Sequence, residues 1–339
     1  MRKWLIGSAV VFTLALLAAG ASLSFAWRFL NSPMQIDEPQ VFVEVPSGTP
    51  LYRLSESLAE RGLLRHPRIL AWYGRLTGDA TRIHAGEYRL TPGTTPIALI
   101  EKLVSGQVYM HQLTIVEGWR FIDVLRVVRA HPAITATELD GAALMAELGK
   151  PDVHPEGQFL PDTYTFPRGT RDVELLGWAH RALERKLDDA WARRTEAVAL
   201  STPYEALILA SIIEKETALE SERRAIAGVF MRRLKRGMRL QTDPTVIYGL
   251  GDSFDGDLRR GDLERDTPYN TYTRFGLPPT PIALASAASI EAAVDPEEGD
   301  ALYFVATGLP DGSHYFSATL EEHNRAVSRY LERLNQARD

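Results

Sequence analysis

The 339-residue sequence contains no cysteine. This excludes disulfide bonds, thiolate metal sites and cysteine nucleophiles, so the fold must be stabilised by packing alone. The eight histidines are scattered singly and no HExxH motif occurs, which argues against a metal site. The GxSxG and GxxxxGK[ST] motifs are also absent, so neither an acyl-hydrolase elbow nor a phosphate-binding loop is supported. We therefore expect no metal and no cofactor.

An excess of positive charge is lacking as well. Lys and Arg number 38 against 44 Asp and Glu, which gives a formal net charge of -6. A protein whose whole surface grips nucleic acid is basic, so we expect no nucleic-acid partner. The hydrophobic fraction of 45% and the charged fraction of 24% are those of an ordinary globular protein. The length suffices for roughly two domains.

Residues 4–27 carry no charged side chain. At about 1.5 Å per residue, this run can cross a hydrocarbon core of about 30 Å. Arg2 and Lys3 before the run, with Trp4 and Trp27 at its ends, favour a single-pass anchor in the plasma (inner) membrane with a cytoplasmic N-terminus. A cleaved signal peptide is the alternative, because the small residues of AAGASLSFA could form a cleavage site. Whether the segment is a retained anchor or a cleaved signal peptide, the rest of the chain is expected to lie on the extracytoplasmic side.

A strand, a glycine turn and a helix recur three times after a polar, proline-containing linker. The turns are centred on Gly48, Gly93 and Gly118, and the apolar residues after them fall at helical spacing. One interpretation is a small α+β module with repeated strand-turn-helix architecture. The other is a carbohydrate-binding module of the LysM type with a β-α-α-β core, and the pattern leaves both open.

Helices are predicted to dominate from Asp172 to about Arg239. Residues 301–319 then read as two strands around a Gly-Pro-Asp-Gly turn. A last amphipathic helix follows, in which Thr319 and Glu322 have the spacing of a capping box. The predicted fold class is therefore α+β, mainly helical in its second part, with a C-terminal hairpin and helix.

The stretch ALILASIIEKET places a carboxylate at the end of an almost entirely apolar helix. Thr202 and Pro203 are a strong helix start, and residues 206–213 should be buried on most of their circumference. Glu214 follows directly. Apolar neighbours would raise the pKa of its carboxyl, which could then serve as a general acid. Periodicity alone favours the plainer interpretation, a solvated helix end.

Two later segments are predicted to be loops rich in hydrogen-bonding side chains. They span Arg239 to Gly251 and Arg265 to Ser286, and they are dense in Gln, Thr, Asp, Asn and Tyr. Such groups suit sugar hydroxyls and pyranose faces, and loops carry them where they line a binding cleft. Core packing with a satisfied hydroxyl is the alternative for each tyrosine.

The strings ILASIIEKET, RLQTDPTVIYG, YNTY and GLPPTPI, in this order and spacing, resemble the endolytic murein transglycosylases of the YceG-like family. EGQFLPDTYTFP and LYFVATGLPDGSHYFS fit the same pattern. The resemblance implies cleavage of the MurNAc–GlcNAc β-1,4 bond within peptidoglycan, which leaves 1,6-anhydro-MurNAc ends and terminates glycan elongation. It also implies that Glu214 is the catalytic residue.

The implied chemistry needs only one acid, because the C6 hydroxyl of the substrate closes on C1 without a water nucleophile. Glu214 would protonate the leaving oxygen and then, as carboxylate, remove the C6-OH proton. The remaining candidates would bind the substrate and stabilise the oxocarbenium-like transition state. They are Glu216, Gln241, Thr242, Asp243, Tyr248, Asn270 and Tyr272.

The resemblance divides the chain into four parts. Residues 1–28 are the cytoplasmic tip and anchor, 29–40 the linker, 41–110 a LysM-like module and 111–339 the catalytic domain. The expected partners are peptidoglycan strands, the membrane and peptidoglycan synthases of the penicillin-binding class. Two rival functions stay open: a muramidase in which Asp243 or Glu216 activates water, and a non-catalytic peptidoglycan-binding scaffold for wall synthases.

Overall fold

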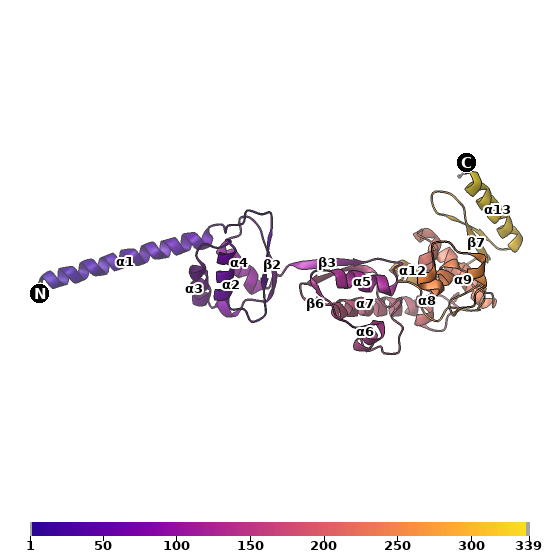
Figure 1. Cartoon of the computed structure of the whole chain (residues 1–339), viewed down its shortest axis with the longest axis horizontal. Helices are drawn as coiled ribbons and strands as arrows, with labels where there is room; N and C mark the ends of the chain where they lie inside the picture. Colours follow the sequence, from indigo (N-terminus) through magenta and orange to yellow (C-terminus); the bar gives the residue numbers. More distant parts are fainter. Residues whose placement is uncertain (1, 337–339) are drawn as a thin grey trace. The chain divides into compact units, whose positions relative to one another are not determined.

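The computed structural model describes residues 2–336, with side chains from Ile6 onward. Its mixed, mainly helical architecture confirms the predicted α+β class (Figure 1). The chain forms two compact units. Unit 1 comprises Met1–His111 and Phe166–Gly169, and unit 2 comprises Gln112–Thr165 and Thr170–Asp339.

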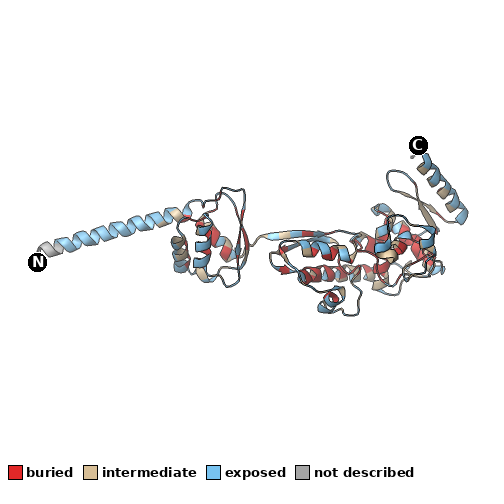
Figure 2. Ribbon diagram, in the orientation of Figure 1, coloured by how far each residue is buried: buried red, intermediate tan, exposed pale blue. Residues whose placement is uncertain are grey.

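Helix α1 (Arg2–Asn31) confirms the predicted N-terminal apolar helix. Its segment Ile6–Asn31 is long and apolar enough to cross a membrane, a test that a signal sequence would also pass. The apolar stretch of that segment is not buried within the protein, although Leu30 near its end is, and Figure 2 colours the helix as exposed along most of its length. The side chains of Arg2, Lys3 and Trp4, on which the predicted orientation depends, lie outside the described ones.

The rest of unit 1 is a two-stranded antiparallel sheet covered by helices. The sheet pairs β1 (Val41–Val45) with β2 (Gly86–Leu90), from Val41 opposite Leu90 to Val45 opposite Gly86. Three helices and a short 3-10 turn complete the unit: α2 (Leu51–Glu60), α3 (Pro67–Thr77), η1 (Asp79–Thr81) and α4 (Pro96–Ser105). Their apolar faces form one buried core with alternate residues of β1.

Residues 29–40, predicted to be a linker, pack against the helices and strands of unit 1. Leu30, Met34 and Ile36 are buried in its core. The Met34 backbone N–H donates to the carbonyl of Thr94 at 2.8 Å. These few apolar side chains order the segment, because burying them removes apolar surface from water.

Unit 2 begins with a mixed region of short strands and helices. The strands β3 (Met110–Ile115) and β5 (Asp162–Pro167) pair with each other, and β4 (Ile134–Thr135) pairs in parallel with β6 (Thr170–Arg171). Three helices accompany them: α5 (Phe121–Ala130), α6 (Gly141–Glu147) and α7 (Asp172–Ala192).

Helix α8 (Pro203–Glu216) lies in the core of unit 2. The Thr202 side chain caps its start by accepting from the Glu205 N–H, as predicted, and every residue from 206 to 213 is buried. It packs against α7, α9 (Arg223–Lys235), α10 (Asp243–Leu250) and α12 (Ala287–Val294). The other helical segments of this region are η2 (Glu220–Glu222), η3 (Gly251–Ser253) and α11 (Arg260–Glu264).

Helix α10 corrects one prediction, because residues 239–251 were expected to be a loop. Pro244 lies in its first turn, where proline favours the start of a helix. Val246 and Thr245 are buried on the side facing the core. The polar residues that suggested a loop therefore lie at the start of a short helix.

The C-terminal elements follow the prediction. Strands β7 (Tyr303–Ala306) and β8 (His314–Ser317) form an antiparallel hairpin, and α13 (Leu320–Gln336) follows. The predicted capping box is present, because the Glu322 carboxylate accepts from the Thr319 N–H and the Thr319 hydroxyl accepts from the Glu322 N–H, both at 3.2 Å.

Candidate functional site

The two acids at the end of α8 have different surroundings. Glu214 and Glu216 are two residues apart, so the helical rotation of about 100° per residue directs their side chains to opposite sides. Both are largely shielded from water, and each carboxyl has its own set of partners. The identity of those partners separates the roles that the two acids can have.

Four donors hold the Glu214 carboxylate. One oxygen, Oε2, accepts from the Ser286 N–H at 2.9 Å, the Ser286 hydroxyl at 2.5 Å and the Ser289 hydroxyl at 2.7 Å. The other, Oε1, lies 3.3 Å from the Arg223 guanidinium. The side chain is 5% exposed. Glu214 thus joins the end of α8 to the start of α12, where the predicted apolar neighbours are replaced by hydrogen-bond donors.

Glu216 lines an open cavity that Glu214 does not line. The pKa of its carboxyl is raised from 4.5 to about 7, chiefly by burial and in part by the nearby negative charge of Asp243. The Thr242 hydroxyl, which donates to Oε1, and the Arg233 charge act in the opposite direction. A carboxyl with this pKa is partly protonated at neutral pH and can both give and take a proton. The sequence analysis had expected these properties of Glu214.

The cavity beside Glu216 has a volume of about 540 Å³. It lies between the end of α8, the start of α10, the β7–β8 hairpin and α13. The structure brings together here five of the predicted site residues, which are Glu216, Gln241, Thr242, Asp243 and Tyr272. The Tyr272 hydroxyl donates to Asp243 Oδ1 at 2.5 Å, so an acid and a phenol already form a hydrogen-bonded pair on its wall.

A second cavity adjoins the first, and a third adjoins the second. A cavity of about 440 Å³ is lined by both Glu214 and Glu216, together with Trp119. A third, of about 660 Å³, is lined by Trp119, Lys215 and Tyr248. Neighbouring cavities share wall residues, with Glu216 common to the first two and Lys215 common to the last two. A row of neighbouring cavities of this kind suits an extended ligand better than a single small molecule.

Gln241 has an unusual backbone. Its φ of 51° is the only positive value of a non-glycine residue in the described part of the chain. This left-handed conformation costs free energy and persists where the surroundings impose it. The Gln241 N–H donates to the Thr271 carbonyl at 3.1 Å, and the Thr242 N–H donates to the Thr271 hydroxyl at 3.0 Å. These bonds hold the strained residue at the cavity wall.

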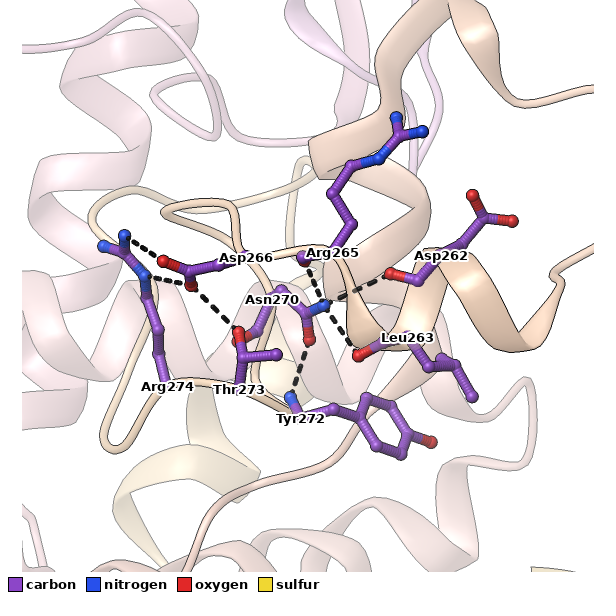
Figure 3. A network of polar contacts seen from close by, with 8 residues as sticks. All are labelled: Asp262, Leu263, Arg265, Asp266, Asn270, Tyr272, Thr273 and Arg274. Carbon is purple, nitrogen blue, oxygen red and sulfur yellow. Dashed lines mark hydrogen bonds and ion pairs between the residues drawn. The ribbon is translucent and has the colours of Figure 1, made fainter.

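Asn270 differs from the other predicted site residues in its surroundings. Its amide nitrogen donates to the carbonyls of Asp262, Leu263 and Arg265, and its oxygen accepts from the Tyr272 N–H at 2.8 Å (Figure 3). The residue is 1% exposed and lines none of the three cavities described above. Asn270 therefore braces the loop that carries Tyr272 and has no free amide for a substrate.

Tyr248 lines the third cavity and not the first. Its hydroxyl donates to Glu156 Oε2 at 3.2 Å, and its ring packs edge-on against Tyr269 with centroids 4.8 Å apart. Burial raises the pKa of Glu156 to about 7, against the opposing effect of the Phe121 N–H, which donates to Oε1 at 2.9 Å.

The sequence analysis singled out no role for Glu156, Arg223, Ser286 or Ser289. Glu156 stands in the string EGQFLPDTYTFP, which was the one available signal for it. The two serines carry no local signal, because they act on a glutamate 72 and 75 residues earlier in the chain.

Comparison with known proteins places the chain in a family. The sequence model of the YceG-like family matches residues 43–329. The endolytic murein transglycosylase of Bacillus subtilis strain 168 is 32% identical over 329 residues, which cover 91% of this chain and 90% of that protein. The endolytic murein transglycosylase of Streptococcus pneumoniae D39 is 28% identical over 97% of this chain and 65% of that protein. This chain also matches the crystal structure of a YceG-like protein from Listeria monocytogenes, with 31% identity and a TM-score of 0.51. The match covers 85% of this chain and 98% of the Listeria chain. The chain belongs to the YceG-like family.

Proposed function

We propose that the protein is an endolytic murein transglycosylase. It cleaves the MurNAc–GlcNAc β-1,4 bond within nascent peptidoglycan strands, leaves 1,6-anhydro-MurNAc ends and so terminates glycan elongation. Family membership and the activity named for the Bacillus relative support this function. The structural observation that carries it is the carboxyl of Glu216, which has a pKa raised to about 7 and lies on the wall of two neighbouring cavities.

We assign the proton transfer to Glu216 in preference to Glu214. The Glu216 carboxyl donates its proton to the glycosidic oxygen as the C1–O bond breaks, and the released GlcNAc end keeps that proton. The resulting carboxylate then takes the proton of the C6 hydroxyl while O6 bonds to C1. No water is consumed, and Glu216 ends protonated as it began. A pKa of about 7 suits a group that acts in turn as acid and as base.

The other wall residues assist from fixed positions. Asp243, paired with the Tyr272 hydroxyl, provides negative charge close to Glu216, where the oxocarbenium-like transition state develops positive charge. Gln241 presents an amide to sugar hydroxyls from the first cavity. Thr242 orients the Glu216 carboxyl through its hydrogen bond.

Glu214 becomes a positioning residue in this proposal. Its four donors fasten the last turn of α8, which carries Glu216, to α12 and Arg223. The neighbouring Lys215 donates to the Gly118 carbonyl at 3.2 Å and fastens the same turn from another side. The final turn of α8 is thereby held rigidly, as proton transfer over hydrogen-bonding distances requires.

The remaining parts of the proposal concern location and organisation. We propose that α1 is retained as a plasma-membrane anchor and that both units lie on the extracytoplasmic side. Residues 1–28 then form the tip and anchor, 29–40 the connection, 41–110 a LysM-like glycan-binding module and 111–339 the catalytic domain. The β-α-α-β order of β1, α2, α3 and β2 is the observation that favours the LysM-like assignment. Penicillin-binding synthases are proposed as partners because they produce the strands that would be cut.

Product analysis tests the function. Purified glycan strands would be digested with the full-length protein in detergent, and the new ends would be identified by mass spectrometry. Anhydro ends are expected. Reducing ends would instead indicate the muramidase, which would need Asp243 to activate water in the cavity that it shares with Glu216. If the strands stay intact, the proposed activity is refuted, and the non-catalytic scaffold is the function that remains.

A further inference from the structure

Helix α3 of unit 1 has an apolar and basic face that no other described element covers. Trp72 is 63% exposed and Leu76 is 79% exposed, and their spacing of four residues places them on one face. Arg68 and Arg75 are also exposed, at helical spacings of four and three from Trp72. Neither arginine forms an ion pair with another described residue.

The sequence around α3 is strongly basic within an acidic chain. Residues 61–78 hold four arginines and no Asp or Glu, whereas the whole chain has a net charge of -6. Arginines interspersed with tryptophan and leucine are typical of a helix at a membrane interface. There the apolar side chains enter the interfacial layer while the guanidinium groups stay at the level of the phosphates.

The start of α3 lies beside α1. The rings of Phe25 and Phe29 pack edge-on against His66, the residue before α3, with centroids 5.3 and 5.1 Å apart. About 20 helical residues cross a hydrocarbon core, and counting from Ile6 this span ends at Phe25. His66 therefore lies near the outer boundary of the hydrocarbon core. Figure 1 shows α3 on the side of unit 1 from which α1 leaves, running across the direction of α1.

The same level of unit 1 contains a cavity of about 360 Å³. Its walls include Phe25, Arg28 and Phe29 of α1, and Arg65 and His66 next to α3. Aromatic and guanidinium groups thus continue from the α3 face to the surface of α1. The residues just before α3 therefore lie against the helix that would cross the membrane.

We propose that the α3 face docks on the outer surface of the membrane crossed by α1, where it binds anionic phospholipids. Trp72 and Leu76 enter the interfacial layer, and Arg68 and Arg75 contact lipid phosphates. The inference rests on the proposed retention of α1 as an anchor. Docking limits the tilt of unit 1 about that anchor, which a single helix alone would leave free.

A single spin label tests the docking, because a chain without cysteine accepts one unique thiol. Full-length L76C, carrying a nitroxide, would be placed in nanodiscs of phosphatidylcholine with about one-third phosphatidylglycerol. Power saturation would then compare the accessibility of the label to oxygen and to a water-soluble nickel chelate. The matched control is E44C, on the exposed side of β1; its partner strand β2 lies at the opposite edge of unit 1 in Figure 1.

The label at position 76 should be more accessible to oxygen and less accessible to nickel than the label at position 44. Adding R68E and R75E to L76C should abolish the difference, as should nanodiscs of phosphatidylcholine alone. Excess inorganic phosphate should leave it unchanged; loss of the contact in phosphate would show that a free anion is bound and would overturn the lipid assignment.

A label at position 76 as accessible to nickel as the one at position 44 would also overturn the proposal. Alkaline carbonate extraction of native membranes tests the anchor separately. If the full chain stays in the membrane while the label is exposed to water, the docking fails and the anchor stands. If carbonate releases the chain, the anchor fails, and the docking inference fails with it.

Discussion

The Glu216→Gln substitution separates catalysis from stability more clearly than any other change in this chain. Glutamine keeps the shape of the side chain and can still accept from the Thr242 hydroxyl, but it cannot exchange a proton. General acid–base catalysis contributes about 10²–10⁴-fold, so turnover should fall by at least about 100-fold. The release of anhydro-ended fragments from purified glycan, followed by chromatography and mass spectrometry, measures this loss.

The stability of the same variant has a predictable pH dependence. In the wild type the pKa of Glu216 is about 7 in the folded state against 4.5 in the unfolded state, so the folded protein binds the extra proton between these values. The contribution of this proton to the free energy of unfolding is fully present below pH 4.5 and is lost as pH rises to 7. At about 1.4 kcal/mol per pKa unit, the loss reaches about 3 kcal/mol. Glutamine does not ionise, so its stability does not depend on pH in this way. Glu216→Gln should therefore be more stable than the wild type at pH 8, and this advantage should be lost as pH falls to 4.5.

Glu214→Gln is the matched control. Its carboxylate is held by the two serines and by Arg223, and replacing it leaves the buried guanidinium without a counter-charge. Breaking such a buried pair costs about 3–5 kcal/mol, so this variant should be less stable throughout the neutral range. At urea concentrations below its unfolding midpoint, Glu214→Gln should retain far more turnover than Glu216→Gln. Urea unfolding at several pH values, beside the glycan assay, tests both; a folded Glu216→Gln with near-wild-type turnover, or a folded Glu214→Gln as inactive as Glu216→Gln, would refute the assignment.

Two further changes test the wall of the first cavity, and a third tests the loop that carries Tyr272. Tyr272→Phe removes the hydrogen bond to Asp243 and should lower kcat/KM by about tenfold, since a bond to a charged acceptor contributes about 1.5–3 kcal/mol; steady-state kinetics on glycan measures it. Gln241→Gly keeps the left-handed backbone and removes only the amide, so we expect lower kcat/KM with a urea midpoint close to that of the wild type. Asn270→Ala leaves three partly buried carbonyls and one N–H without their partner, so it should lose about 2–4 kcal/mol of unfolding free energy in urea titrations.

Features that depend on neighbouring residues could be predicted from the sequence. The start of α8 at Thr202 and the capping box of Thr319 and Glu322 each involve groups within three residues of one another. The glycine turns were predictable in the same way, since Gly48 and Gly93 adopt left-handed φ values of 78° and 89°. The helix α10 was missed because its polar first turn has the composition of a loop, and only burial of its inner face distinguishes the two.

The roles of the two acids could not be predicted. IIEKET shows that carboxylates stand at the end of an apolar helix, and it contains nothing that distinguishes Glu214 from Glu216. The partners that do so are distant in the chain: Ser286 and Ser289 for Glu214, and Thr242 for Glu216.

The sequence by itself determined the family, the apolar N-terminal helix, the α+β class and the short list of candidate residues. These follow from local periodicity, capping patterns and the order of specific strings. Only the tertiary structure decided which carboxyl lines the first cavity with a raised pKa, that Asn270 braces a loop, and that the α3 face is left uncovered. Burial and hydrogen bonding between distant segments set these properties, and proton affinity depends on that environment and not on residue type alone.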